Sequence, residues 1–351
     1  MAQRSEREIS YPPKPKPGDR VAVVSPSAGL PEVFPKVYEL GLRRLRDELG
    51  LEPVEYPTTR VLGADPRDRA RDLTAAFADP SIKAVLAVIG GDDQIRVVPH
   101  LDDDVLRANP KPFFGSSDNT NLLNHLFNLG VVGYHGGSVM VHLGRSGALH
   151  PMSTDSLRAA LFTSGRYPLA AAERYSDEPN DWNDPASLDR EPSTFPAPDW
   201  SWYGPATVVE GPVWGGCLEV VNWLLAAGRV GSDTALAGCI LLIETSEELP
   251  SDVEVYRILR NMGERGLLAG FPAALVGRPK AWDFGRRNTP EQKRAYAEAQ
   301  RAAVRRAFAE YNPDAVLVFD LDVGHTDPQL IVPYGGLARV DAVERRICVR
   351  Y

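Results

Sequence analysis

The chain has 351 residues and a formal net charge of −8, with 39 basic against 47 acidic residues. No basic cluster points to a nucleic-acid partner, and no apolar stretch is long enough to span a bilayer. The first 20 residues lack the apolar core of a signal peptide. We therefore expect a cytoplasmic protein of two domains, because the length exceeds that of one typical domain.

The cysteines and histidines show no metal-binding pattern. Cys217, Cys239 and Cys348 lie far apart and form no CxxC motif, which fits a reducing compartment and excludes a disulfide framework. None of the six histidines falls in an HExxH or paired-His motif, and there is no GxxxxGK[ST] loop. We expect no cofactor and no metal, which leaves nucleophilic catalysis as the main enzymatic option.

Strand and helix patterns alternate through residues 1–165. Buried strands are predicted over 21–28, 52–56, 84–91, 110–115 and 131–137, and helices over 37–50, 70–79 and 121–130. This order is typical of a parallel sheet with helices on both faces. It predicts an N-terminal three-layer α/β domain of flavodoxin-like type.

Residues 166–210 predict a connecting loop or lid. The segment from Tyr175 to Pro205 is rich in proline, aspartate and tryptophan and has no periodicity. Such long irregular segments are lids, binding loops or linkers, but a linker is poor in aromatic residues. Trp182, Trp200 and Trp202 therefore favour an ordered, functional loop; alternatively, they anchor the loop to the body of the protein.

Residues 211–351 predict a smaller, mixed β/α domain. Apolar strands are expected over 238–244 and 273–280, an amphipathic helix over 255–268, and a long charged helix over 289–311. Several short strands separated by turns are expected after residue 313.

Two serines stand where an apolar strand meets a helix, in FFGSSDNTNLL. A nucleophile on such a junction is exposed on a sharp turn, next to the backbone N–H groups of the helix N-terminus. Ser117 is favoured over Ser116 because Gly115 stands two residues before it, where a crowded turn needs a residue without a side chain. The alternative is that Ser116 to Asn119 only cap the helix.

Glu244 and His325 are candidate partners of this serine. Glu244 ends the apolar strand GCILLI, where a carboxylate can orient a histidine, although it could also mark the point where the strand reaches solvent. His325 lies in LDVGHTDPQL, a turn after a strand, where many histidines are simple surface residues.

Four segments taken together resemble the LD-carboxypeptidase family of serine peptidases. They are GDRVAVVSPSA, the GSSD turn, the strand ILLIE and the turn GHTDPQLIVPYG, which span the chain from about residue 18 to its end. The resemblance implies a triad of Ser117, Glu244 and His325, with an oxyanion hole formed by the N–H groups of Asp118 and Gly91. One departure is Cys217, which follows two glycines where the family often has asparagine.

The resemblance also suggests a substrate. The 175–205 loop is similar to an insertion in the branch of microcin C self-immunity peptidases, which cleave an aminoacyl–nucleotide amide. That branch implies a small-molecule or peptidyl-nucleotide substrate bound by Gly90, Trp182 and Trp202, with Trp182 stacking on the nucleobase. A muropeptide LD-carboxypeptidase that releases D-alanine, and an inactive ligand-binding relative, are the alternatives. The family further suggests a homodimer.

Overall fold

The computed structural model describes residues 9–351, so the first eight residues of the proline-rich lead lie outside it. Five parallel strands form the N-terminal half of the sheet, in the order β2-β1-β3-β4-β5. Their bounds are β1 (Arg20–Val24), β2 (Glu52–Glu55), β3 (Ile82–Ala87), β4 (Phe113–Gly115) and β5 (Gly133–His135). This is the strand order of flavodoxin-like folds, as predicted.

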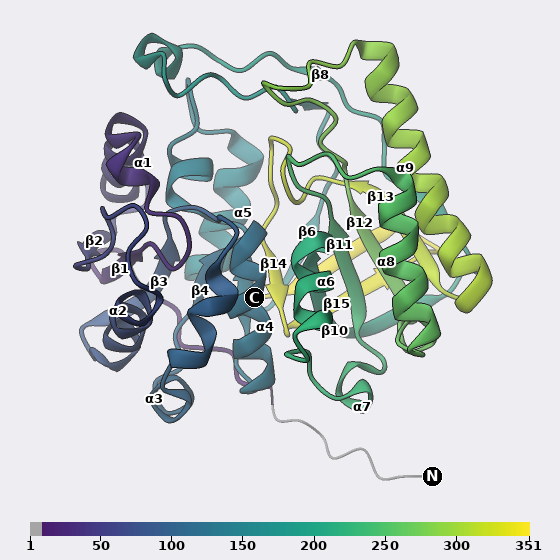
Figure 1. Ribbon diagram of the computed structural model, residues 1–351, viewed down its shortest axis with the longest axis horizontal. Helices are drawn as coiled ribbons and strands as arrows, with labels where there is room; N and C mark the ends of the chain where they lie inside the picture. Colours follow the sequence, from purple (N-terminus) through teal and green to yellow (C-terminus); the bar gives the residue numbers. More distant parts are fainter. Residues whose placement is uncertain (1–8) are drawn as a thin grey trace.

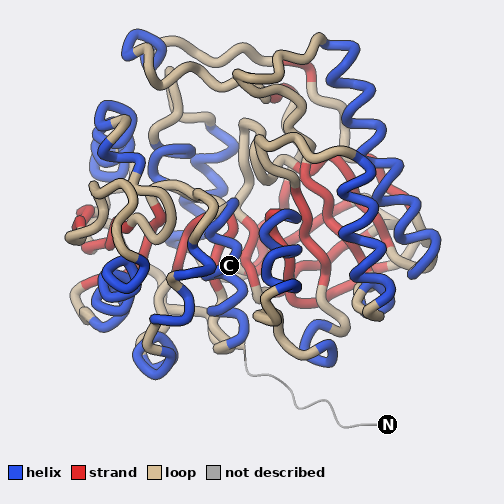
Figure 2. The backbone as a smooth tube through the Cα atoms, in the orientation of Figure 1, coloured by secondary structure: helices blue, strands red, loops and turns tan. Residues whose placement is uncertain are grey.

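Helices lie on both sides of these strands (Figure 2). They are α1 (Pro35–Asp47), α2 (Pro66–Ala78), α3 (Asp103–Ala108), α4 (Thr120–Asn128) and α5 (Pro151–Phe162), with single turns η1 (Leu30–Glu32), η2 (Gln94–Arg96), η3 (Val98–His100), η4 (Ser117–Asn119) and the π-helical η5 (Val139–Leu143). Four of the five residues of β1 are buried, which explains its continuous apolar sequence.

The C-terminal half contributes a second set of parallel strands, β10 (Val208–Cys217), β11 (Ile240–Glu244), β12 (Ala273–Gly277) and β13 (Val316–Leu321). Helices α6 (Leu218–Ala226), α7 (Asp233–Leu236), α8 (Asp252–Glu264) and α9 (Pro290–Tyr311) accompany them, with the turn η7 (Leu268–Gly270). Capping boxes begin α8 at Ser251 and α9 at Thr289, and each satisfies backbone N–H groups that the first turn leaves free.

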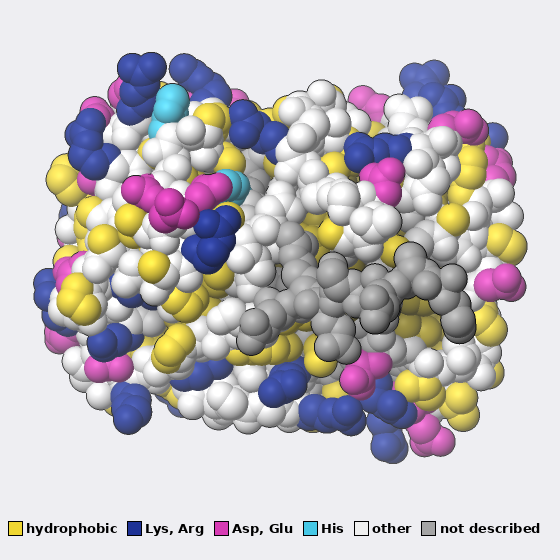
Figure 3. Space-filling model, turned by 90° about the horizontal axis from the view of Figure 1, so that it is seen from below, with side chains coloured by type: hydrophobic (Ala, Val, Ile, Leu, Met, Phe, Trp, Pro, Cys, Tyr) yellow, Lys and Arg dark blue, Asp and Glu magenta, His cyan; other side chains and the backbone are white. Residues whose placement is uncertain are grey.

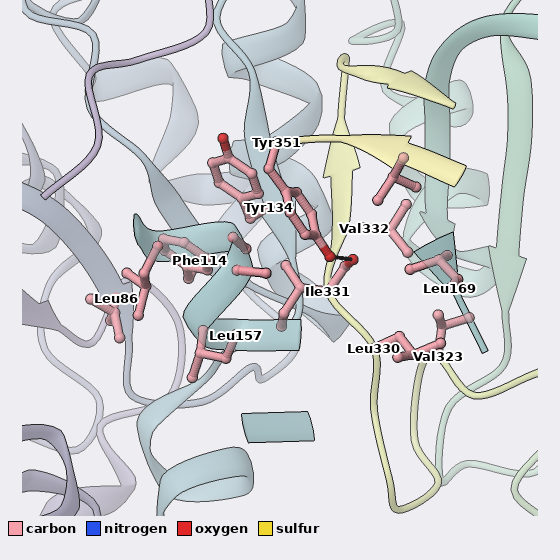
Figure 4. Packing of buried hydrophobic residues seen from close by; sticks show 14 of the residues in the cluster. Leu86, Phe114, Tyr134, Leu157, Leu169, Val323, Leu330, Ile331, Val332 and Tyr351 are labelled. Atoms are coloured by element: carbon pink, nitrogen blue, oxygen red, sulfur yellow. Dashed lines mark hydrogen bonds between the residues drawn. The ribbon is translucent and has the colours of Figure 1, made fainter. Parts of the chain in front are cut away.

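The two halves join into one mixed sheet through β14 (Val332–Tyr334), which is antiparallel to β5 and parallel to β10. β14 lies between β5 and β10, and β15 (Leu337–Asp341), β16 (Arg346–Arg350) and β6 (Arg166–Leu169) extend from β10. The hydrophobic core is continuous across this junction: Phe114 and Tyr134 stack near Leu330 and Ile331, and the Tyr351 hydroxyl donates to the carbonyl of Ile331 at 2.6 Å (Figure 4).

The 175–205 segment crosses the top of the molecule from the α1 side to the α9 side (Figure 1). It contains the short pieces β7 (Arg174–Tyr175), η6 (Pro185–Asp189), β8 (Phe195–Pro196) and β9 (Ser201–Tyr203). The opposite face, seen from below, carries basic and acidic side chains interspersed with each other (Figure 3). None of the helices within residues 9–351 has both the length and the apolar character needed to cross a bilayer.

Candidate active site

Ser117 lies on a strained turn between β4 and α4. Its φ of 60° is in the left-handed region, which residues other than glycine, asparagine and aspartate rarely adopt. A side chain on Gly115 would come within 2.8 Å of the Asn119 side chain, so the turn requires glycine there. The side chains of Ser116 and Asn119 make no capping hydrogen bond to the helix. The local structure is therefore a strained turn of the kind that can expose a nucleophile, and not a simple helix cap.

Asp118 fixes this turn to the loops that follow β1 and β3. Its buried carboxylate accepts hydrogen bonds from the Ser27 hydroxyl, from the backbone N–H of Gln94 at 2.8 Å and from the Asn121 amide at 2.8 Å. Burial raises the pKa of Asp118 above its ordinary value, although the bonds from Ser27 and Gln94 act in the opposite direction. The β1 and β3 loops flank the point where the strand order reverses, which is where open α/β sheets bind ligands.

Gly90 and Gly91 lie in the loop after β3, which ends at Ala87, four residues earlier than the predicted strand. A Cβ on Gly90 would lie 2.8 Å from Ser117 Cβ and 3.3 Å from the backbone nitrogen of Asp118. A Cβ on Gly91 would lie 2.2 Å from the Ser27 hydroxyl. Gly90 therefore packs directly against the Ser117 turn, and Gly91 packs against the loop after β1.

Replacing Gly90 with alanine should lower kcat by about 100-fold, because the new methyl group displaces Ser117 and small misplacements of reacting groups are costly. Steady-state kinetics on any accepted substrate measures this loss. Gly270→Ala is the matched control, since the nearest atom to its Cβ is at an ordinary 3.4 Å. Equal kinetics for the two variants would contradict a crowded turn at Ser117.

Glu244 and His325 form a close pair at the end of β11. Glu244 is buried, and its Oε2 lies 2.6 Å from Nδ1 of His325. Two glycines make this approach possible, because a Cβ on Gly324 would come within 2.4 Å of Glu244 Oε2 and one on Gly277 within 2.7 Å of Glu244 Cβ. The carboxylate can thus hold the imidazole through Nδ1, which leaves Nε2 on the opposite side of the ring.

The pairing of Glu244 with His325 shifts the pKa of both side chains. Burial would lower the pKa of His325, but the charge and hydrogen bond of Glu244 outweigh it, and the pKa is raised to about 9. Burial would likewise raise the pKa of Glu244, but the charge and hydrogen bond of His325, with the nearby His135, lower it to about 2. The pairing therefore favours the charged form of both side chains.

Two sets of contacts place the Glu244–His325 pair at the same edge of the sheet as the Ser117 turn. Gly115 is paired in register with His135, whose Nε2 lies 3.7 Å from Glu244 Oε1. In the second set, Glu244 is in register with Cys217, whose backbone N–H donates to the Thr120 hydroxyl at the start of α4. His135 was one of six histidines in the sequence, and its place directly at the end of a short strand was the signal that could have singled it out.

The catalytic geometry is not complete in this structure. Among residues 9–351 no hydrogen bond joins the Ser117 hydroxyl to His325. Instead, Nε2 of His325 lies 3.1 Å from Oε2 of Glu247, in the loop after β11. Sequence reasoning did not identify Glu247, because nothing local distinguishes it from its neighbour Glu248.

His325 also lines a pocket beneath the 175–205 loop. Trp182, Asn180, Lys280 and Gln329 line the same pocket, whereas Ser117 does not. Trp182 packs edge-to-face on Phe34, with the ring centroids 5.4 Å apart. Trp202 lies elsewhere: it is in β9, in register with Val318 of β13, and is not among the residues that line this pocket.

Ion pairs attach the loop to both halves of the molecule. The carboxylate of Asp177 lies 2.6 Å from Lys293 Nζ, and its backbone carbonyl accepts from Lys280 at 3.0 Å. On the other side, Glu191 lies 2.7 Å from Arg145, which also pairs with Asp327 at 2.9 Å. The loop is therefore ordered and attached to both halves.

No cluster of three or more His, Cys, Asp or Glu residues that could hold a metal ion occurs within the described part of the chain. The thiol of Cys217, at the family's frequent asparagine position, is buried beside Glu219 at 3.4 Å.

The chain is similar to known proteins over most of its length. The chain matches the family models of the LD-carboxypeptidase N-terminal domain over residues 21–136 and of the LD-carboxypeptidase C-terminal domain over residues 210–340. It is 26% identical to the microcin C7 self-immunity protein MccF of Escherichia coli over 81% of this chain and 78% of the relative. It is 28% identical to the murein tetrapeptide carboxypeptidase of Pseudomonas aeruginosa, over 91% of this chain and 92% of that one.

Solved structures share the whole fold. An MccF-like protein from Streptococcus pneumoniae in complex with AMP has a TM-score of 0.81 and 28% identity, covering 95% of this chain and 99% of its own. MccF in complex with glutamyl sulfamoyl guanosine also has a TM-score of 0.81, with 97% and 98% covered, and at 23% identity this similarity concerns the fold. Because the family models together match more than half of its length, the chain belongs to the LD-carboxypeptidase family of serine peptidases.

Proposed function

We propose that the protein is a serine hydrolase in which Ser117, His325 and Glu244 act as nucleophile, general base and orienting carboxylate. The observation that carries this proposal is the buried Glu244–His325 pair, 2.6 Å apart, at the same sheet edge as a serine held at a φ of 60°. Loss of the Nε2 proton and a small shift of the imidazole toward Ser117 would complete the triad, and catalytic hydrogen bonds often shorten only when substrate binds.

The reaction would follow the order of acyl transfer. His325 Nε2 takes the proton from the Ser117 hydroxyl as its oxygen attacks an amide carbonyl, and Glu244 stabilises the imidazolium. The N–H groups of Asp118 and Gly91 would bind the oxyanion, a role supported by the packing of the Gly90 backbone against Ser117 and Asp118. The imidazolium then protonates the leaving amine, and water hydrolyses the acyl-enzyme.

The proposed substrate is an aminoacyl- or peptidyl-nucleotide conjugate, such as an aminoacyl sulfamoyl adenylate. Trp182 and His325 line one pocket, so a base stacked on the indole would place the rest of the ligand near the histidine. Solved structures of the same fold hold the MccF-like protein of Streptococcus pneumoniae in complex with AMP and MccF in complex with aspartyl sulfamoyl adenosine. Gly90 would contribute close backbone approach, whereas the position of Trp202 in β9 gives no support to a binding role.

The decisive experiment compares hydrolysis of an aminoacyl sulfamoyl adenylate with that of a murein tetrapeptide. We expect turnover of the first to exceed that of the second. Preferential release of D-alanine from the tetrapeptide would instead establish the second candidate, a muropeptide LD-carboxypeptidase. The full-length similarity to a murein tetrapeptide carboxypeptidase is the observation that supports this second candidate.

Trp182→Ala should raise KM for a nucleotide substrate by about 10- to 100-fold, since stacking on one aromatic ring contributes about 1–3 kcal/mol. Steady-state kinetics measures this, and Trp182→Phe, which keeps an aromatic face, should restore much of the affinity. If Trp182 only anchors the loop on Phe34, the alanine variant will impair substrates with and without a base alike.

Family membership also supports a homodimer, and three cysteines that form no disulfide within residues 9–351 support a reducing, cytoplasmic location. Light scattering of the purified protein and fractionation of cells test these two expectations.

A further inference from the structure

The ring nitrogen of His325 that would act as the base, Nε2, contacts a second carboxylate. Nδ1 of His325 lies 2.6 Å from Glu244, and Nε2 lies 3.1 Å from Glu247. A ring between two carboxylates is bound best as an imidazolium that donates both N–H groups. In that state Nε2 has no lone pair for the Ser117 proton.

The two carboxylates differ in how firmly they are held. The Glu244 side chain has no exposed surface, whereas 57% of the Glu247 side chain is exposed. Glu247 lies in the short loop between β11 and α8, and its only ion pair among the described residues is with His325. A half-exposed ion pair is weak and exchanges readily, so Glu247 can leave while Glu244 stays.

We propose that Glu247 is a positioning residue for His325. Glu247 holds Nε2 of His325 in the free enzyme and must withdraw before Ser117 can be activated. This inference rests on the proposed triad. The imidazolium loses its Nε2 proton to solvent water as Glu247 withdraws, and the lone pair so exposed accepts the hydrogen of the Ser117 hydroxyl. A substrate that fills the space beside His325 would favour the withdrawal.

The other charged groups near His325 do not replace this contact. Glu219 on α6 acts on His325 only through space, because its carboxylate binds Ser246 at 2.7 and 2.9 Å. Lys280 after β12 is close enough to Glu247 for their charges to interact, but it is bonded to the carbonyl of Asp177.

Further charged groups near His325 are bound to other side chains. On β5, His135 faces Oε1 of Glu244. Arg145 and Asp327, which line the same pocket as His325, pair with each other. Glu247 is thus the group whose removal should specifically release Nε2.

Glu247→Gln tests the proposal through the pH dependence of kcat/KM. Glu247 helps to raise the pKa of His325, so removing its charge should move the acid limb toward lower pH. For a shift of about one unit, kcat/KM at pH 7 rises about tenfold while the high-pH plateau stays unchanged. Glu248→Gln is the matched control, because it removes the same charge one residue further on without contacting His325.

An unchanged pH profile, or a shift equal to that of Glu248→Gln, would overturn the proposal. So would a loss of activity at every pH, which would place Glu247 among the groups that touch substrate. An NMR titration of the His325 ring, assigned with a His325→Asn variant, separates this inference from the proposed function because it needs no turnover. If the titration shifts in Glu247→Gln but no amide is cleaved, the contact is real and the proposed function is wrong.

Discussion

Ser117→Ala should lower kcat for amide hydrolysis by about four to six powers of ten, as loss of the nucleophile does in serine hydrolases. The substitution removes one oxygen and keeps the Cβ, so the backbone at φ 60° and its packing against Gly90 remain. Folding and ligand affinity should therefore be unchanged, which calorimetric binding of the uncleaved substrate can verify. Rapid-mixing assays with wild type should also show an acyl-enzyme that the variant does not form.

The neighbouring serine provides the control. Ser116 is also buried at this turn, but it has an ordinary extended conformation, and its side chain makes no capping bond. Ser116→Ala should cost less than about tenfold, because only its backbone carbonyl serves the turn, as an acceptor for Asn119. If Ser116→Ala were the inactive variant and Ser117→Ala the active one, the assignment of the nucleophile would be reversed.

Local pattern was sufficient to predict most of the fold. The strands around VAVV and ILLIE are buried on both faces, so their sequences are continuously apolar and stand out from the amphipathic helices. The α5 helix, Pro151–Phe162, was missed, since its serines and threonine obscure the apolar face. The pairing of β5 with β14 could not be derived either, because it joins His135 to Val332, and local sequence carries no record of such distant partners.

The candidate site was predictable to a smaller degree. A strand-end carboxylate and a turn histidine can be recognised from sequence, and Glu244 and His325 do meet. The sequence could not show that Nε2 of His325 would face Glu247. That contact depends on the path of the short loop after β11 and on a few ångströms of side-chain length. Trp182 and Trp202 show the same limit, because both lie in the aromatic-rich loop and both were candidates for substrate binding. In the structure, Trp182 lines the pocket with His325, whereas Trp202 forms part of an edge strand.

Glu244→Gln should lower kcat by about 10⁴-fold, the effect of the corresponding acid-to-amide change in a serine protease. The amide fits the same space beneath Gly277 and Gly324, but its NH₂ group facing Nδ1 favours the tautomer with the proton on Nε2, which cannot accept a proton from Ser117. Glu219→Gln is a matched control, since that buried carboxylate binds Ser246 and not the imidazole, and it should retain most activity. Activity of Glu244→Gln within tenfold of wild type would exclude the orienting role.

The same substitution has a pH signature in stability. The pKa of His325 is raised to about 9 in the folded protein, so its pairing stabilises the fold fully below about pH 6.5, the ordinary histidine value, and this contribution is lost as pH rises through 9. The pKa of Glu244 is lowered to about 2 from its ordinary 4.5, so its contribution is present above 4.5 and is lost as pH falls toward 2. The difference in free energy of unfolding between wild type and Glu244→Gln should therefore be largest between about pH 4.5 and 6.5 and should shrink above pH 9. Urea denaturation from pH 4 to 10 measures this difference, and a constant value across the range would mean that the two side chains are not charged partners in the folded protein.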